Sequence, residues 1–363
     1  MKKFFSLILF ACFLMNSCKT KEETLTADEA RKFALSLEKD AAEKRIDFIE
    51  KNIFVDALLE RMFKVGNMNI KKSSRSGLQK GVEQALKKHN SEKNIYNTLG
   101  TTGSLSLVKQ YEKDGRHRVI FRAYGTGGLN YFDMELTKMK GKTGIADILV
   151  YTTGDNLSTS MAELAEKLLG AEGNETKDFK DGIADIQMHV RYNDYKKAKA
   201  AYDKLPAETK NTKVMEALYL LIIPQLEGDE YHAEMSKLES KYASDPNSQL
   251  MLIDVYLVKK DYEKALRSID MIDKNINTDP FLNFYRGLVY NMKEDREKAI
   301  EHFEKAAIAM PGFGDNLAEL FVQYASAGNK EQAIKYFKAY KGLKNKDPEI
   351  VSYYEEQFPF LAE

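Results

Sequence analysis

The chain has 363 residues, of which 43% are hydrophobic and 11% aromatic, and this composition excludes disorder throughout. Lys plus Arg and Asp plus Glu both number 55, so no net charge steers the chain to nucleic acid. Both cysteines, Cys12 and Cys18, lie near the N-terminus. The rest of the chain therefore excludes disulfides, thiolate catalysis and cysteine-ligated zinc.

The first segment has the pattern of a signal peptide. Lys2 and Lys3 precede an apolar run at 4–15, in which only Ser6 is polar. A helix of this length rises about 18 Å, which is too short to cross a hydrocarbon layer of roughly 30 Å. The core of a signal peptide fits that length.

The apolar run ends in Met15-Asn16-Ser17-Cys18. This sequence resembles the lipobox of bacterial lipoproteins in its looser Bacteroidetes form, in which the cysteine is lipidated. The resemblance implies a signal peptide at 1–17, a lipid on Cys18, a lipidated tether at 18–24 and a cell-envelope location, with the outer membrane favoured. An ordinary signal peptide with a chance cysteine is the alternative. Lys19-Thr20-Lys21-Glu22-Glu23 looks like a surface-export signal or a solvated tether, which leaves the side of the membrane open.

Residues 25–170 are expected to form one domain that begins with helices. Thr26-Ala27-Asp28-Glu29 has the pattern of a capping box. Apolar residues at spacings of three and four predict helical stretches around 30–37, 46–63 and 78–86, the second with a break near Lys51-Asn52.

Alternation of apolar and polar residues between 105 and 151 then predicts four antiparallel strands. The Asp114-Gly115 turn is a hairpin signal, and Ser160 is expected to start a closing helix. Helices on one face of a curved four-stranded antiparallel sheet define an α+β domain. The order of elements resembles the NTF2-like or cystatin-like folds.

A polar, glycine-bearing stretch at 171–180 is expected to be a linker. Beyond it only helical patterns occur. We expect an all-α repeat array at 181–346 and a C-terminal capping helix at 347–363, and we expect the two domains to fold separately because their hydrophobic periods differ.

Three short motifs recur every 34 residues: Asp261–Leu266, Asp295–Ile300 and Asn329–Ile334. This period resembles the tetratricopeptide repeat (TPR), a helix-turn-helix unit. The resemblance implies roughly five units that stack into a superhelix with a concave groove. Small residues at Ala265, Ala299 and Ala333 would allow close helix crossings.

The groove positions of this family fall on mostly apolar residues. We expect an amphipathic helix or an extended peptide of a protein partner to bind there, unless the register is shifted by one and these are core residues. The candidate partner-binding residues are Leu250, Met251, Phe281, Phe284, Tyr285 and Leu288. Further groove positions are Asp254, Asp315, Glu319 and Val322.

No catalytic or metal-binding motif is present in the sequence. The histidines lack ligand spacing, and Gly125-Thr126-Gly127-Gly128 lacks the third glycine of a dinucleotide fingerprint. Asp133, Glu135 and Asp147 can converge as acid/base groups or metal ligands, but a solvated strand face is the favoured interpretation. We therefore predict no cofactor, no metal and no enzymatic activity.

The leading hypothesis is a membrane-anchored lipoprotein that acts as a protein–protein interaction scaffold through the repeat groove. One alternative is an enzyme or a small-ligand binder with its site inside the curved sheet of 25–170. Another is a glycan-binding lipoprotein similar to the starch-binding lipoproteins of Bacteroidetes. The absence of Trp argues against an aromatic glycan platform.

Overall fold

The computed structural model describes residues 22–45, 48–66, 72–88, 99, 103–125, 127–170, 174–245, 248–344 and 346–362. The expected signal peptide, the lipidation site Cys18 and most of the tether lie outside the described residues, which begin at Glu22. Within the described ranges, no helix combines the length and the apolar character needed to cross a membrane.

The sheet is antiparallel and has five strands in the order β1-β2-β3-β4-β5, rather than the four expected. The fifth strand has only two residues, too few for an alternating pattern to be recognised in the sequence. The strands are β1 (Ser104–Lys113), β2 (Arg116–Gly125), β3 (Gly128–Met139), β4 (Lys142–Val150) and β5 (Asp155–Asn156).

Two tight turns join the strands at one end of the sheet. Asp114-Gly115 and Lys140-Gly141 both have φ near 52° and 71°, which is the geometry of a type I′ hairpin turn. Glycine is favoured at the second position because an L side chain is strained at positive φ.

The helices of the first part follow the predicted pattern with one difference. The capping box is confirmed: the Glu29 N–H donates to Thr26 Oγ1 over 3.2 Å and the Thr26 N–H to Glu29 Oε2 over 3.0 Å. The closing helix begins at Leu157 rather than after Ser160. The helices are α1 (Ala27–Ala42), the 3-10 turn η1 (Glu50–Asn52), α2 (Val55–Val65), α3 (Lys72–Lys88) and α5 (Leu157–Gly170).

One face of the sheet packs on these helices. Val119, Phe121 and Met134 have no exposed surface and form a core with Leu37 of α1 and Leu58 of α2. This is the apolar face that alternation predicts. Because helix side chains fill it, the inner face of the sheet holds packed core residues.

The remainder of the described chain is helical, and it starts earlier than expected. Helix α6 begins at Asn174, inside the stretch predicted to be a linker. The other elements are α7 (Tyr195–Asp203), α8 (Ala207–Lys210), α9 (Lys213–Ile222), η2 (Ile223–Gln225), α10 (Gly228–Tyr242), α11 (Gln249–Val258), α12 (Tyr262–Ile276), α13 (Leu282–Met292), α14 (Arg296–Ala309), α15 (Gly314–Ser326), α16 (Lys330–Lys341), α17 (Pro348–Gln357) and η3 (Pro359–Leu361).

Three helix pairs, α11/α12, α13/α14 and α15/α16, repeat the same local structure. Asp261, Asp295 and Asn329 each cap the second helix of a pair, and each side chain accepts a backbone N–H over 3.2 Å. Such caps satisfy free N–H groups at helix starts. The geometry confirms the 34-residue register and a helical repeat of TPR type.

Close helix crossings hold each pair together. Ala265, Ala299 and Ala333 are fully buried. At Gly287, a Cβ atom would lie only 2.4 Å from the Phe303 ring. The small residues are therefore required by the approach of the neighbouring helix, as the sequence pattern indicates.

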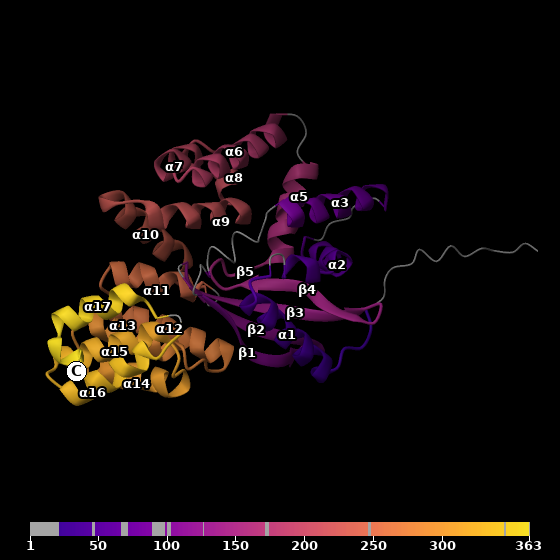
Figure 1. Ribbon diagram of the computed structural model, residues 1–363. Coiled ribbons are helices and arrows are strands. Elements are labelled where there is room, and N and C mark those ends of the chain that lie inside the picture. Colours follow the sequence, from indigo (N-terminus) through magenta and orange to yellow (C-terminus); the bar gives the residue numbers. More distant parts are fainter. Residues whose placement is uncertain are drawn as a thin grey trace, which may run out of the picture.

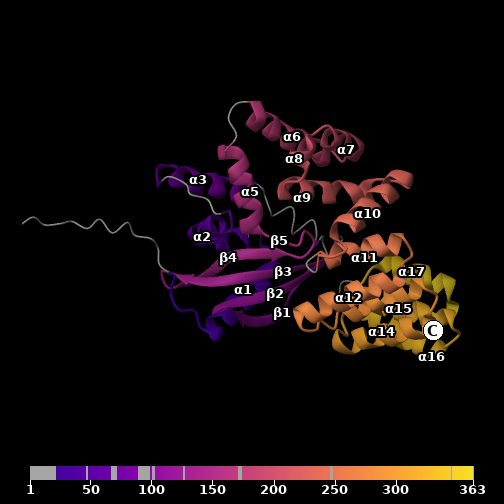
Figure 2. The same cartoon turned by 180° about the vertical axis from the view of Figure 1, so that it is seen from behind.

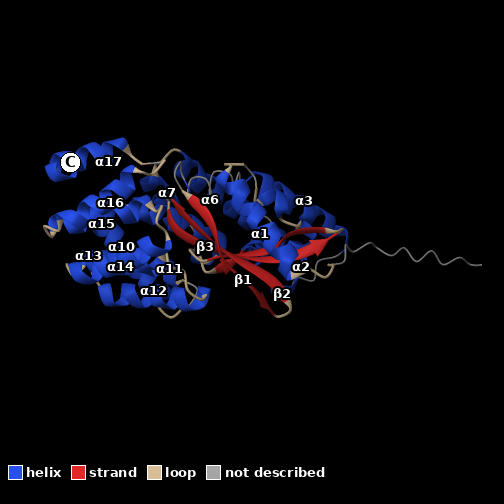
Figure 3. Ribbon diagram, turned by 60° about the horizontal axis from the view of Figure 1, so that its bottom comes forward, coloured by secondary structure: helices blue, strands red, loops and turns tan. Residues whose placement is uncertain are grey.

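The sheet and the repeats share one core. Ile120, Leu129 and Tyr131 of the second sheet face cluster with Phe281 and Phe284 of the repeats. Figures 1 and 2 show α11–α17 beside one end of the sheet, with α6–α10 leading to them from α5. In Figure 3, coloured by secondary structure, the strands lie between the repeat helices on the left and helices α2 and α3 on the right. The two parts thus pack on each other through this shared core, and their separate folding stays a prediction from the sequence.

Candidate functional site

The contact between sheet and repeats is built around one buried carboxylate. Asp279, just before α13, accepts from Arg122 Nη1 on β2 over 2.7 Å and from the Tyr131 hydroxyl on β3 over 2.9 Å. It also accepts the Phe281 N–H over 3.1 Å, which fixes the start of α13. The Asp279 side chain is 3% exposed and that of Arg122 11%, so solvent screens this pair only weakly.

An aromatic cluster surrounds the ion pair. Tyr124 of β2 lies 4.8 Å from the Phe281 ring and 5.4 Å from the Phe313 ring, and Phe284 lies 4.9 Å from Phe313. The Arg122 guanidinium stacks 4.4 Å above the Phe281 ring. Offset and edge-on contacts of this kind add attraction beyond the area they bury.

The Tyr124 hydroxyl extends the contact onto α15. It donates to Asp315 Oδ2 over 2.7 Å, and burial together with this carboxylate raises the pKa of Tyr124. The phenol therefore keeps its proton and remains a donor. The β2–β3 end of the sheet thus touches α13 and α15 at once.

The six predicted partner-binding residues all belong to the core cluster that includes this contact. Leu250, Phe281 and Phe284 are 6%, 2% and 4% exposed, and Phe281 and Phe284 pack on Tyr124 of the sheet. Tyr285 is half-buried, with its hydroxyl next to the Leu129 backbone. Met251 and Leu288 are also half-buried. Of the residues that the sequence assigned to a partner, Phe281 and Phe284 therefore contact the protein's own sheet.

Two of the groove positions predicted from the sequence, Asp254 and Glu319, are acidic and lie beyond the contact with the sheet. Asp254 of α11 keeps contact with solvent, yet the surrounding protein desolvates its carboxyl and raises its pKa to about 6. Glu319 of α15 is half-buried, and burial followed by the charge of Asp315 raises its pKa. Burial, and after it the charges of Asp254 and Asp315, raise the pKa of the Tyr285 hydroxyl. The described residues supply no basic partner within ion-pair distance to Asp254 or Glu319.

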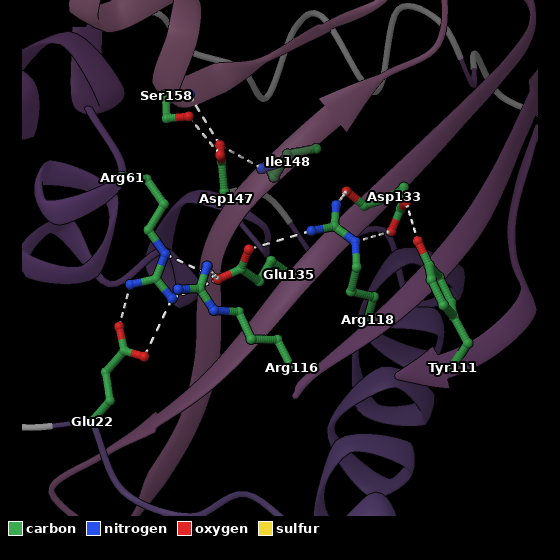
Figure 4. Close-up of polar contacts among 10 residues, drawn as sticks. All are labelled: Glu22, Arg61, Tyr111, Arg116, Arg118, Asp133, Glu135, Asp147, Ile148 and Ser158. Atoms are coloured by element: carbon green, nitrogen blue, oxygen red, sulfur yellow. Dashed lines mark hydrogen bonds and ion pairs between the residues drawn. The ribbon is translucent and has the colours of Figure 1, made fainter. Parts of the chain in front are cut away.

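A second polar cluster lies within the sheet (Figure 4). Asp133 accepts from Arg118 Nε over 2.9 Å and from the Tyr111 hydroxyl. Glu135 accepts from Arg61 Nε over 2.9 Å and from Arg116 Nη1 over 3.0 Å. Arg118 bridges the two carboxylates through a 3.3 Å contact to Glu135.

Asp147 lies beside this cluster but binds backbone N–H groups and a hydroxyl in place of an arginine. It accepts the Ser158 N–H and the Ile148 N–H, each over 2.9 Å, and also the Ser158 hydroxyl. It therefore caps helix α5 from a neighbouring strand, and this bond explains why α5 begins before Ser160. Burial raises the pKa of its carboxyl.

The solvated strand face expected for Asp133, Glu135 and Asp147 is wrong, because they are 5%, 6% and 6% exposed. Arginine side chains bind Asp133 and Glu135, and backbone N–H groups bind Asp147. The signal that was missed is cross-strand charge pairing: Arg118 stands directly opposite Glu135 in the β2–β3 register. In the described part of the chain, no group of three or more potential ligands can hold a metal.

No protein-family model matches the chain, and no curated protein matches it. Among solved structures, a crystal structure of MamA protein is 19% identical, with 45% of this chain and 90% of that chain covered and a TM-score of 0.36. MamA 41-end from Desulfovibrio magneticus RS-1 is 18% identical, with 49% and 99% covered and a TM-score of 0.39. At these TM-scores the likeness carries no weight for function, and the repeat assignment depends on the helix caps and buried alanines described above.

Proposed function

We propose that the protein is a lipid-anchored scaffold of the cell envelope that binds a segment of another protein in the open part of the repeat groove. The lipobox-like sequence ending at Cys18 supports the anchor. Stacked helix pairs support the scaffold, since arrays of this type present an extended concave surface. Neither enzymatic activity nor a cofactor is part of the proposal.

The observation that carries the proposal is that two acidic side chains, Asp254 and Glu319, lie close to the residues of the contact between sheet and repeats. The contact with the sheet end supports the proposal, because it combines aromatic contacts with hydrogen bonds to Asp279 and Asp315. Beside it, Asp254 is exposed and Glu319 is half-buried, so both carboxyls are open to a cation, and nearby protein raises the pKa of each by desolvation. The groove therefore fits a segment with Lys or Arg near apolar residues.

The alternative of a catalytic or small-ligand site in 25–170 gains no support from the polar cluster of the sheet. Each acid drawn in Figure 4 already pairs with an arginine or with N–H groups. The opposite sheet face is packed against helices α1 and α2.

The proposal is tested with labelled peptides of matched apolar content that carry basic, neutral or acidic residues. Fluorescence anisotropy should show binding of the basic set, weakened at least about tenfold in Asp254→Asn/Glu319→Gln, a loss that equals about 1.4 kcal/mol. Glu297→Gln/Glu331→Gln is the matched control, since both residues are exposed on second helices of their pairs. Equal affinity for all three peptide sets, or equal loss in the control, would refute a cation-binding groove.

A further inference from the structure

The residues that follow the lipidation site are fixed to one end of the sheet. The Glu23 N–H donates to the Lys138 carbonyl over 2.8 Å, and the two residues form an antiparallel bridge. The Glu23 carboxylate accepts the Gly141 N–H over 3.1 Å. The chain therefore enters the fold as a short added strand along the last residues of β3.

Two side-chain pairs hold this entry in place. Glu22 pairs with Arg61 of α2, which is anchored in turn on Glu135. Lys138 Nζ donates to Glu29 in the first turn of α1 over 2.6 Å. The entry point is thus tied to α1, α2 and β3, and its direction is set by the fold.

The distance from this entry to a lipid on Cys18 is short. Glu22 is four positions after Cys18. Consecutive Cα atoms lie about 3.8 Å apart, so the Cα atoms of these two residues are at most about 15 Å apart in any conformation. A lipid anchored at Cys18 must therefore lie near the Lys138–Lys142 turn, whichever path the intervening residues take.

The chemistry of the Lys138–Lys142 turn suits a lipid surface. It contains three lysines. Lys138 pairs with Glu29 and the Glu23 carboxylate binds the Gly141 N–H, which leaves Lys140 and Lys142 as its exposed cations. Basic residues close to a membrane are attracted by anionic headgroups within a Debye length. The repeats sit at the other end of the strands, where Tyr124 and Tyr131 contact them.

Strand length sets the separation between the two ends. β3 has 12 residues, which at about 3.3 Å per residue span roughly 36–40 Å. Figures 1 and 2 show α11–α17 on the side of the sheet away from the Lys138–Lys142 turn. The geometry points to a membrane-facing end at this turn, with the repeat groove displayed away from the lipid layer. This inference rests on the proposed lipid on Cys18.

The test uses the lipidated full-length protein in vesicles of phosphatidylethanolamine and phosphatidylglycerol that carry a headgroup quencher. Once Cys18 is lipidated, a single introduced cysteine is the only free thiol after Cys12 has been removed with the signal peptide. A fluorophore on Lys142→Cys should be quenched several-fold more than one on Met292→Cys, an exposed position at the far end of α13. Equal or reversed quenching would overturn the orientation. Protein that does not float with vesicles would instead refute the lipid anchor.

A second variant tests whether the fixed tether sets the orientation. A Gly/Ser linker of about 10 residues inserted before Glu22 adds roughly 16–19 Å of average reach and leaves every described contact intact. The quenching difference between the two labels should then shrink at least twofold. A difference that survives the linker would overturn the role assigned to the tether.

Discussion

Arg122 and Asp279 lie 157 residues apart in sequence and form a buried ion pair in which one guanidinium nitrogen contacts both carboxylate oxygens, over 2.7 and 2.8 Å. The pair joins strand β2 to the start of helix α13. It packs the sheet against the repeat array, and it brings the sheet end onto residues at which the sequence predicted a partner.

Removing the arginine should therefore destabilise the whole protein. Arg122→Ala leaves Asp279 buried without its cation and should lower the free energy of unfolding by about 3–5 kcal/mol. Urea unfolding measures this loss. Lys293→Ala is the control, because its pair with Glu263 is largely exposed and should contribute about 0–1 kcal/mol. Similar small losses in both variants would argue against a buried pair.

Phe284 should behave as a core residue. Truncation in Phe284→Ala should cost about 3–5 kcal/mol, because the ring packs on Phe313 and the neighbouring Tyr124. A double-mutant cycle with Tyr124→Ala should show a coupling of about 0.5–1.5 kcal/mol. Additive losses would mean that the sheet does not contact this helix in solution.

The 34-residue register makes a steric prediction. Ala299→Trp should destabilise the protein by at least about 1–3 kcal/mol through overpacking, since Ala299 has no exposed surface. Ile308→Trp on the same helix, at a site 83% exposed, should change the melting temperature little. Comparable melting of the two variants would show that Ala299 does not lie at a helix crossing.

Binding of basic peptides should depend on pH. Because burial raises the pKa of Asp254 to about 6, its carboxylate gains charge as pH rises from 5 to 7, and affinity should rise with it. The same shift means that ionisation of Asp254 lowers fold stability as pH rises from its unfolded pKa of about 4 through 6. Asp254→Asn should flatten both profiles. A binding profile identical in the two proteins would remove Asp254 from the site.

Local features of this fold could be predicted from the sequence, and long-range ones could not. The caps Asp261, Asp295 and Asn329 and the Asp114-Gly115 turn depend on residues a few positions apart, so spacing reveals them. The contact of Tyr124 with Phe281 depends on two segments that only the folded chain brings together. Apolar residues at groove positions look the same in sequence whether their partner is another protein or the same chain.

The polar cluster of the sheet shows the same limit in a different form. Alternation identifies the strand that carries Asp133 and Glu135, and it assigns them to the face opposite the apolar core. It does not show that Arg61, from helix α2, covers Glu135. Burial of a charged strand face depends on which other elements fold over it.

The central claim is that the sheet and the repeat array unfold as one unit, and one measurement tests it directly. The chain has no Trp. Phe132→Trp, on the inner sheet face, therefore places a single tryptophan reporter in the sheet. Far-ultraviolet circular dichroism of the same sample reports mainly the helices. Urea unfolding followed by both signals should give coincident transitions with one midpoint. Two separate midpoints would contradict the account, because they would mean that the repeat helices stay folded after the sheet has unfolded.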